Sequence, residues 1–339
     1  MGTIYQARDT VLRRVVALKV LPRDYVSQRE HRERFIREAQ AAAKIHHRNV
    51  VAVHDVSVHD PLYIVMEYLE GETFEALLRR EAPVSFERAL ALLLPVMSAV
   101  AAAHESRVIH RDLKPANIML SRERDGTITP KVLDFGISKL SKVTREFRAV
   151  SPRDLNLTDR EAQIGTPNYM APEQDGSNHA VGPWSDGYAL ALMLYRAVTG
   201  RLPFVGRNMV EVLYRKRHGV FTALSEFPFG LPPELDAWMR RALAPDPAER
   251  FSTVVEMACA LLPMASEALR ARWTPAFDPS LDDSDPSTVP PPQPEAVTAL
   301  AIPVESTLGH GDPSTTTAGG LAPPRRARFT PRERALAGA

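Results

Sequence analysis

The sequence has almost no cysteine and no segment of the kind that crosses a membrane or leads to one. Its single cysteine, Cys259, lies among apolar residues in STVVEMACALL, which excludes internal disulfide bonds and a zinc site built on several cysteines. There is no run of about 18 apolar residues, the length that spans a bilayer. The start shows no basic segment followed by an apolar one, as a secretion signal would. We therefore expect a cytoplasmic protein without a membrane span.

The composition also lacks any strong bias in charge. The 339 residues carry a formal net charge of +1, and 44% of them are hydrophobic. These values are ordinary for a globular protein. Because there is no excess of positive charge to attract a polyanion, we expect no nucleic-acid partner.

Lysine and large apolar residues become scarce near the C-terminus. Residues 271–339 contain 12 of the 29 prolines and no lysine. Such a segment cannot bury enough apolar surface to offset the entropy lost on ordering. We place a disordered, proline-rich tail at 269–339.

The remaining residues divide into a strand-rich part and a helix-rich part. Strand patterns crowd the first 68 residues in IYQA, VVALKVL, VVAVHDVSV and LYIVMEY, with one helical segment between them, whereas helical spacing dominates after Gly71. We therefore predict an α+β chain with two lobes, at 1–70 and 71–268. A cleft between two lobes is a common place for a small-molecule site.

Two short segments carry most of the chemistry. VIHRDLKPANIML places Asp112, Lys114 and Asn117 on one loop, so an acid, a base and an amide there can accept a proton, neutralise an anion and bind a metal. In KVLDFGISK, Asp134 follows a short strand and precedes a glycine. A carboxylate in that position suits magnesium, which takes one or two carboxylates together with phosphate oxygens.

Four motifs occur in the order VALK, HRDLKPAN, DFG and GTPNYMAPE, and together they resemble the eukaryotic-like serine/threonine protein kinases, particularly the bacterial members. The resemblance covers residues 1 to about 265. It implies a bilobal protein kinase fold and transfer of the ATP γ-phosphate to serine or threonine hydroxyls of proteins, with Mg²⁺. Lys114, two residues after Asp112, and Thr166 in GTPNYMAPE are the features that resemble the serine/threonine type.

The resemblance implies a role for each polar residue of these motifs. Asp112 orients the substrate hydroxyl and accepts its proton, Lys114 neutralises the γ-phosphate, and Asn117 and Asp134 hold magnesium.

It also implies a set of ATP-binding residues in and near the small lobe. Lys19 pairs with the α- and β-phosphates and is positioned by Glu38 on the following helix. The other ATP-binding residues that the resemblance implies are Gly2, Ile4, Ala17, Glu67 and Met119.

Other matches to the family are structural. Glu173 is expected to pair with Arg250, and Asp186 to anchor the catalytic loop from a buried helix. His110 is a candidate base by its chemistry alone, but the resemblance packs it beneath the phenylalanine of DFG. The family usually has a bulky aliphatic residue where Gly187 stands, so we expect a looser helix there.

The segment between Gly136 and Ala171 is long, with 34 residues rich in hydroxyl and arginine side chains. We expect an autophosphorylation switch with Thr158 as the leading site, carried out in a transient homodimer. Arg111 is placed to bind a phosphate there. The alternative is a solvated insertion whose hydroxyl groups are incidental.

The family's glycine-rich loop, G-x-G-x-x-G-x-V, is represented only by Gly2 and the residues after it. The first strand is missing, so we expect the second strand to have an unpaired edge. We favour a true start upstream of Met1 over a genuine truncation. If the loop is incomplete, the alternative function is a pseudokinase or kinase-like scaffold with impaired ATP binding.

Overall fold

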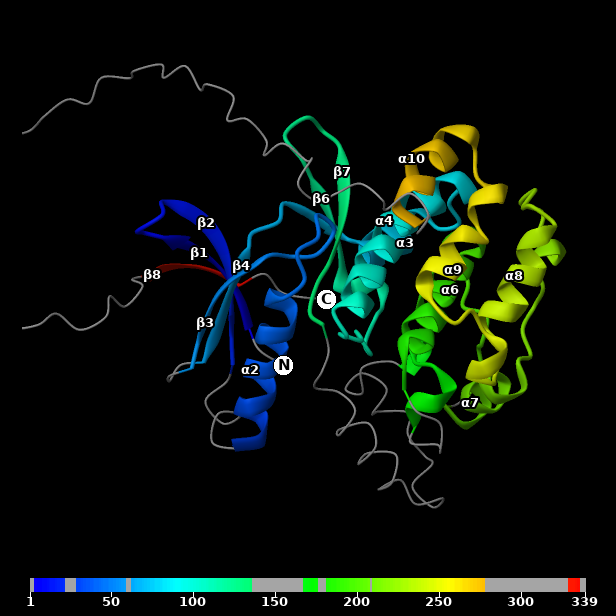
Figure 1. Ribbon diagram of the computed structural model, residues 1–339, viewed down its shortest axis with the longest axis horizontal. Helices are drawn as coiled ribbons and strands as arrows, with labels where there is room; N and C mark the ends of the chain where they lie inside the picture. Colours follow the sequence, from blue (N-terminus) through cyan, green and yellow to red (C-terminus); the bar gives the residue numbers. More distant parts are fainter. Residues whose placement is uncertain are drawn as a thin grey trace, which may run out of the picture.

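The computed structural model describes residues 3–21, 29–58, 62–135, 167–175, 181–207, 209–277 and 329–335. These residues form a small strand-rich lobe and a large helical lobe (Figure 1). The predicted α+β, bilobal architecture is confirmed.

The small lobe is an antiparallel sheet with one helix against it. Its elements are β1 (Thr3–Asp9), β2 (Arg14–Val20), α2 (Arg29–Ala43), β3 (Val53–Ser57) and β4 (Tyr63–Glu67). The strand order is β3-β4-β2-β1-β8, where β8 (Phe329–Ala335) comes from the far end of the chain. Asp9 Oδ1 accepts the backbone N–H groups of Val11 and Leu12, which shapes the turn between β1 and β2.

Alternation of apolar residues along the strands produces the core of this lobe. Ile64 and Met66, two residues apart on β4, are buried on one face of the sheet. Phe35 and Ala39, one helical turn apart on α2, belong to the same buried cluster. Helix α2 therefore covers the face of the sheet that contains this cluster.

The large lobe is built around two long buried helices. Its elements are β5 (Gly71–Thr73), α3 (Phe74–Glu81), α4 (Phe86–Glu105), β6 (Ile118–Arg122), β7 (Ile128–Val132), α6 (Pro183–Thr199), α7 (Met209–His218), α8 (Glu234–Ala242), α9 (Val254–Cys259) and α10 (Glu267–Phe277). By length and composition, α4 is apolar enough to cross a bilayer. Twelve of its residues are buried in the core of the lobe, where its apolar surface packs against neighbouring elements such as α6.

The two lobes are joined through the segment before β3. The Asn49 side chain donates to the Pro130 carbonyl at 2.7 Å, and the Asn49 carbonyl accepts the Val132 N–H at 2.8 Å. Val51 N–H then donates to the Val132 carbonyl. Figure 1 shows the β6–β7 hairpin beside the small-lobe sheet, so these bonds set the position of β7 relative to that sheet.

The predicted tail began too early. Helix α10 extends to Phe277, whose side chain is 2% exposed. Leu269, Trp273 and Phe277 recur every four residues and pack on the core of the large lobe. The prolines and the acidic residues that follow hid this apolar pattern, so the boundary at 268–269 is wrong and the folded part continues to residue 277.

The expected unpaired edge is also not found. Residues 329–335, assigned to the tail, form β8 on the outer side of β1. Composition over a long window cannot detect a strand of seven residues that gains its hydrogen bonds from a distant partner. The rest of the tail lies outside the described residues.

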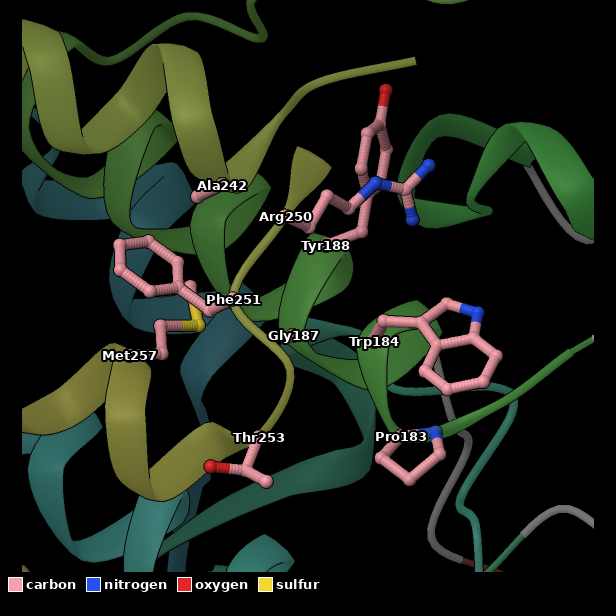
Figure 2. A pocket seen from close by; sticks show the side chains of 9 residues that line it. All are labelled: Pro183, Trp184, Gly187, Tyr188, Ala242, Arg250, Phe251, Thr253 and Met257. Carbon is pink, nitrogen blue, oxygen red and sulfur yellow. The ribbon is translucent and has the colours of Figure 1, made fainter. Parts of the chain in front are cut away.

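A small cavity lies beside α6, lined by residues that include Gly187, Tyr188, Arg250 and Met257 (Figure 2). Its volume of about 10 Å³ has room for no more than one water molecule. A Cβ atom added at Gly187 would lie 3.5 Å from Met257 Sδ, an ordinary van der Waals distance. Helix α6 runs without a break through Gly187 and ends at Gly200, which has φ 73°.

We predict that Gly187→Ala stabilises the protein by about 0.5–1 kcal/mol, because alanine restricts the unfolded backbone and partly fills the cavity. The matched control is Gly200→Ala at the end of the same helix. It should destabilise by about 1 kcal/mol, because a Cβ atom is unfavourable at positive φ. Urea unfolding measures both. Equal effects of the two substitutions would contradict this account of α6.

A buried ion pair closes the large lobe. Arg250 donates to the two carboxylate oxygens of Glu173 at 2.9 and 3.0 Å, and both side chains are almost fully buried. Ser185 Oγ donates to Glu173 at 2.6 Å, and Arg250 Nε donates to the Ala244 carbonyl. The ion pair expected from the sequence is therefore present, with additional hydrogen bonds to each partner.

We predict that Glu173→Gln and Arg250→Met each lower the free energy of unfolding by about 3–5 kcal/mol, because each leaves the other charge buried without its partner. The double variant should lose much less than the sum of the two. A double-mutant cycle from denaturant unfolding tests this coupling. Strictly additive losses would show that the two charges do not stabilise each other.

Candidate active site

The loop between α4 and β6 gathers three of the predicted catalytic side chains. Asn117 Nδ2 donates to the Asp112 carbonyl at 2.8 Å and to Asp112 Oδ2 at 3.1 Å. Lys114 Nζ lies 3.3 Å from the same carboxylate oxygen. The loop closes on itself because Pro115–Asn117 form a 3-10 turn directly before β6.

Asp134 lies beside this loop and meets a residue of the small lobe. It follows β7 and has φ 44°, and its Oδ1 is 2.7 Å from Lys19 Nζ. The Leu133 N–H donates to the Asn117 carbonyl at 2.8 Å, which ties the residue before Asp134 to the loop. Lys19 and Asp134, 115 positions apart in the sequence, therefore form an ion pair between the lobes. The predicted partner Glu38 lies in α2, but its side chain is outside the described part of the chain.

The bonds to His110 give its ring a structural role. The ring is fully buried and its centroid is 4.9 Å from that of Phe135, as expected. His110 Nδ1 accepts the Asp112 N–H at 3.3 Å, and Nε2 contacts the Leu133 carbonyl at 2.9 Å. Because a carbonyl only accepts, Nε2 holds the proton and the ring is neutral with both nitrogens engaged. Asp112 is thus the better proton acceptor on this loop.

Asp186, buried on α6, holds the backbone of the catalytic loop. Its Oδ2 accepts hydrogen bonds from the backbone N–H of His110 at 2.8 Å and from Nε2 of His104 at 2.7 Å. Its Oδ1 accepts the backbone N–H of Arg111 at 2.8 Å. Arg111 has φ 65°, which is uncommon for a residue with a side chain. These bonds hold the backbone in that conformation directly before Asp112.

Gln174 was not anticipated from the sequence. Its side-chain nitrogen donates to the Arg111 carbonyl at 2.7 Å, and its oxygen accepts the Ala171 N–H at 2.9 Å. A side-chain amide that joins two distant backbone groups leaves no periodic signal. Its position directly after the APE motif is the only sequence feature that points to it.

The other predicted ATP-binding residues lie on the sheet side of the site. Ile4 is opposite Lys19 in the β1–β2 register, and Ala17 packs against the small-lobe core. Met119 is half-buried in β6, and the Glu67 carboxylate is held by Lys131 Nζ at 2.8 Å. Their contacts with ATP stay predictions.

Three predicted residues, Gly2, Thr158 and Thr166, lie outside the described part of the chain. The structure therefore reports neither on the glycine-rich loop nor on the expected phosphorylation site.

The donor set fits magnesium better than a metal that needs a dense cluster. Among the described residues, no group of three or more His, Cys, Asp and Glu side chains lies together. Asn117 donates through its side-chain nitrogen to Asp112, and its backbone carbonyl accepts the N–H of Leu133, the residue before Asp134. One carboxylate and one amide oxygen are sufficient where phosphate oxygens supply further ligands.

Lys216 is a second side chain that the sequence did not indicate. It is buried on α7 and donates to the carbonyls of Asn168 and Met170 at 3.0 and 2.7 Å, in the segment that follows Thr166. Burial lowers the pKa of Lys216 to about 7, although the nearby Glu173 carboxylate acts in the opposite direction. The hydrogen bonds from Lys216 thus hold the segment of Asn168 and Met170 against α7.

We predict that Lys216 makes stability depend on pH. Its folded pKa of about 7 is below the ordinary 10.5, so between these values the unfolded chain binds more protons. The free energy of unfolding must therefore rise with pH over that range, by up to about 1.4 kcal/mol per unit. Lys216→Met should lack this rise. Urea unfolding of both proteins at pH 7, 8 and 9 measures it, and a constant difference between them would contradict the prediction.

Comparison with known proteins agrees with this geometry. Residues 1–273 match the family model for the protein kinase domain. The chain is 38% identical over 262 residues to the serine/threonine-protein kinase PknB of Mycobacterium tuberculosis, covering 76% of this chain and 40% of that protein. It is 34% identical over 259 residues to PrkC of Bacillus subtilis, covering 76% of this chain and 37% of that protein. It therefore spans about two fifths of the length of these relatives.

A solved structure shows the same fold. The crystal structure of the M. tuberculosis PknI kinase domain aligns with a TM-score of 0.57 at 29% sequence identity, covering 78% of this chain and 91% of that one. Together with the family match and the grouping of Lys19, Asp112, Asn117 and Asp134, these similarities show that the chain belongs to the protein kinase family, among the bacterial, eukaryotic-like serine/threonine members.

Proposed function

We propose that this chain transfers the γ-phosphate of ATP to serine or threonine hydroxyls of proteins. The observation that carries the proposal is the ion pair between Lys19 and Asp134 beside the loop of Asp112, Lys114 and Asn117. Phosphoryl transfer needs alignment of the reacting groups and positive charge near the developing negative charge. This grouping offers both.

In the proposed reaction the substrate hydroxyl oxygen bonds to the γ-phosphorus, the bond to the β–γ bridging oxygen breaks, and ADP leaves. Asp112 accepts the hydroxyl proton, and Asn117 holds the Asp112 carboxylate in place. Lys114, 3.3 Å from that carboxylate, adds positive charge beside the transferred group. Lys19 orients the other phosphates.

Magnesium bound by Asn117 and Asp134 would neutralise phosphate charge. Because the two residues that would hold magnesium, the two lysines and the proton acceptor are grouped, the site favours an enzyme over a kinase-shaped binding module.

Regulation is a further part of the proposal. We propose that the protein is cytoplasmic and that Thr158 is autophosphorylated in a transient homodimer. Arg111 supports the phosphorylation, since its Nε is buried without a hydrogen-bond acceptor among the described residues. A phosphate would supply the missing acceptor.

We predict that Asp112→Asn lowers phosphate transfer from radiolabelled ATP to a generic protein substrate by about 100-fold or more, because the proton acceptor is lost. The matched control is Asp125→Asn, which makes the same chemical change in the exposed turn between β6 and β7. It should retain full activity, and unfolding curves check that both variants fold. Equal incorporation by Asp112→Asn and wild type, or none by wild type, would overturn the proposed function.

A further inference from the structure

The C-terminal segment of the chain lies on the outer edge of the small-lobe sheet. In Figure 1, β8 is the red strand beside the blue strand β1. The two are antiparallel, with Ala335 opposite Tyr5 and Phe329 opposite Asp9, and the register is interrupted once, between Tyr5 and Ala7. Among the described strands, only β8 lies on the outer side of β1.

An open β1 edge would be unfavourable. All seven residues of β1 pair with β2 on the inner side, so the outward N–H and C=O groups depend on another strand or on water. An uncovered strand of this length is also a template for unwanted pairing with other chains. A strand held by the same chain removes that exposure.

The composition of residues 329–335, FTPRERA, suits an edge position. Pro331 lacks the N–H that an inner strand needs for its ladder, so proline within a sheet is confined to edges and bulges. Two arginines and a glutamate follow it, and charged residues on an edge strand discourage further pairing. The segment can therefore both extend the sheet and end it.

The direction of β8 connects it to the candidate site. The strand ends opposite Tyr5, and the neighbouring Ile4 is opposite Lys19 in the β1–β2 register. Hydrogen bonds that fix β1 at this end also restrain the part of β2 that carries Lys19. Lys19 forms the ion pair with Asp134 that joins the two lobes. The position of the Lys19 side chain in the site therefore depends on how well this end of the sheet is ordered.

The same chain can reach this edge. Helix α10 ends at Phe277, and residues 278–328 separate it from β8. Fifty-one residues can extend to roughly 170 Å, far more than the small lobe requires.

We propose that residues 329–335 act as a tethered strand that completes the small-lobe sheet within one molecule and orders the Lys19 end of β2. The effect on ATP rests on the proposed function, whereas the strand pairing does not.

The first test is hydrogen exchange of the backbone amides of β1 in the full chain and in a variant lacking residues 329–339. The outward amides of β1 should exchange about tenfold faster or more in the deletion variant. A matched control lacks residues 300–310, the same number from the intervening segment, and should match wild type. Unchanged protection in the first variant would overturn the proposal.

Two proline variants test the pairing without shortening the chain. Neighbouring residues in a regular strand direct their N–H groups to opposite edges, and Phe329 and Thr330 lie in the uninterrupted part of the register, opposite Asp9 and Arg8. Of Phe329→Pro and Thr330→Pro, therefore, only one removes a hydrogen bond to β1. One variant should lose protection of β1 and the other should keep it. Equal behaviour of the two would contradict the pairing.

Addition of a peptide comprising residues 325–339 to the deletion variant should restore protection, and a scrambled peptide should not. Sedimentation of the full chain should give a monomer while β1 is protected. Protection that appears only in a dimer would show that a second copy supplies the strand and would overturn the intramolecular form.

ATP binding then tests the link to the site. The deletion variant should bind ATP about fivefold more weakly or worse, with the control deletion unchanged. Equal affinity would overturn the ordering of Lys19 by β8. If wild type binds no ATP, the proposed function fails, while hydrogen exchange still decides the strand pairing.

Discussion

The carboxylate of Asp186 accepts hydrogen bonds from the backbone of His110 and Arg111, and the catalytic loop is built around them. Without these bonds, the left-handed conformation of Arg111 would have little support. Asp112 follows directly, and its position determines where Asn117 and Lys114 can meet it. The geometry of the site therefore depends on a carboxylate that takes no part in the chemistry.

The two lobes are stabilised to different degrees. The large lobe has one extensive core around α4 and α6, and a buried ion pair closes it. The described core of the small lobe consists of two clusters, of seven and three buried residues. In a lobe with so little buried apolar surface, the hydrogen bonds between β1 and β8 are a larger share of the total stabilisation than they would be in the large lobe.

Membership of the kinase family explains the motifs but not the whole chain. Residues 1–273 match the family, whereas β8 begins at Phe329. A segment outside the matched region thus lies on the outer edge of β1. Its contribution depends on backbone hydrogen bonds, which many sequences can make, so no motif marks it.

Local sequence determined much of the catalytic loop. Three of its polar residues, Asp112, Lys114 and Asn117, lie within six positions of one another. The turn that begins at Pro115 keeps their backbone close together. The two lobes and the Glu173–Arg250 pair also followed from pattern and resemblance. Tertiary structure alone decided the extension of α10 to Phe277, the bridge made by Gln174, the burial of Lys216 and the pairing of β8 with β1. Each of these depends on a partner distant in the sequence, and neither composition nor periodicity specifies which distant groups a side chain or strand will meet.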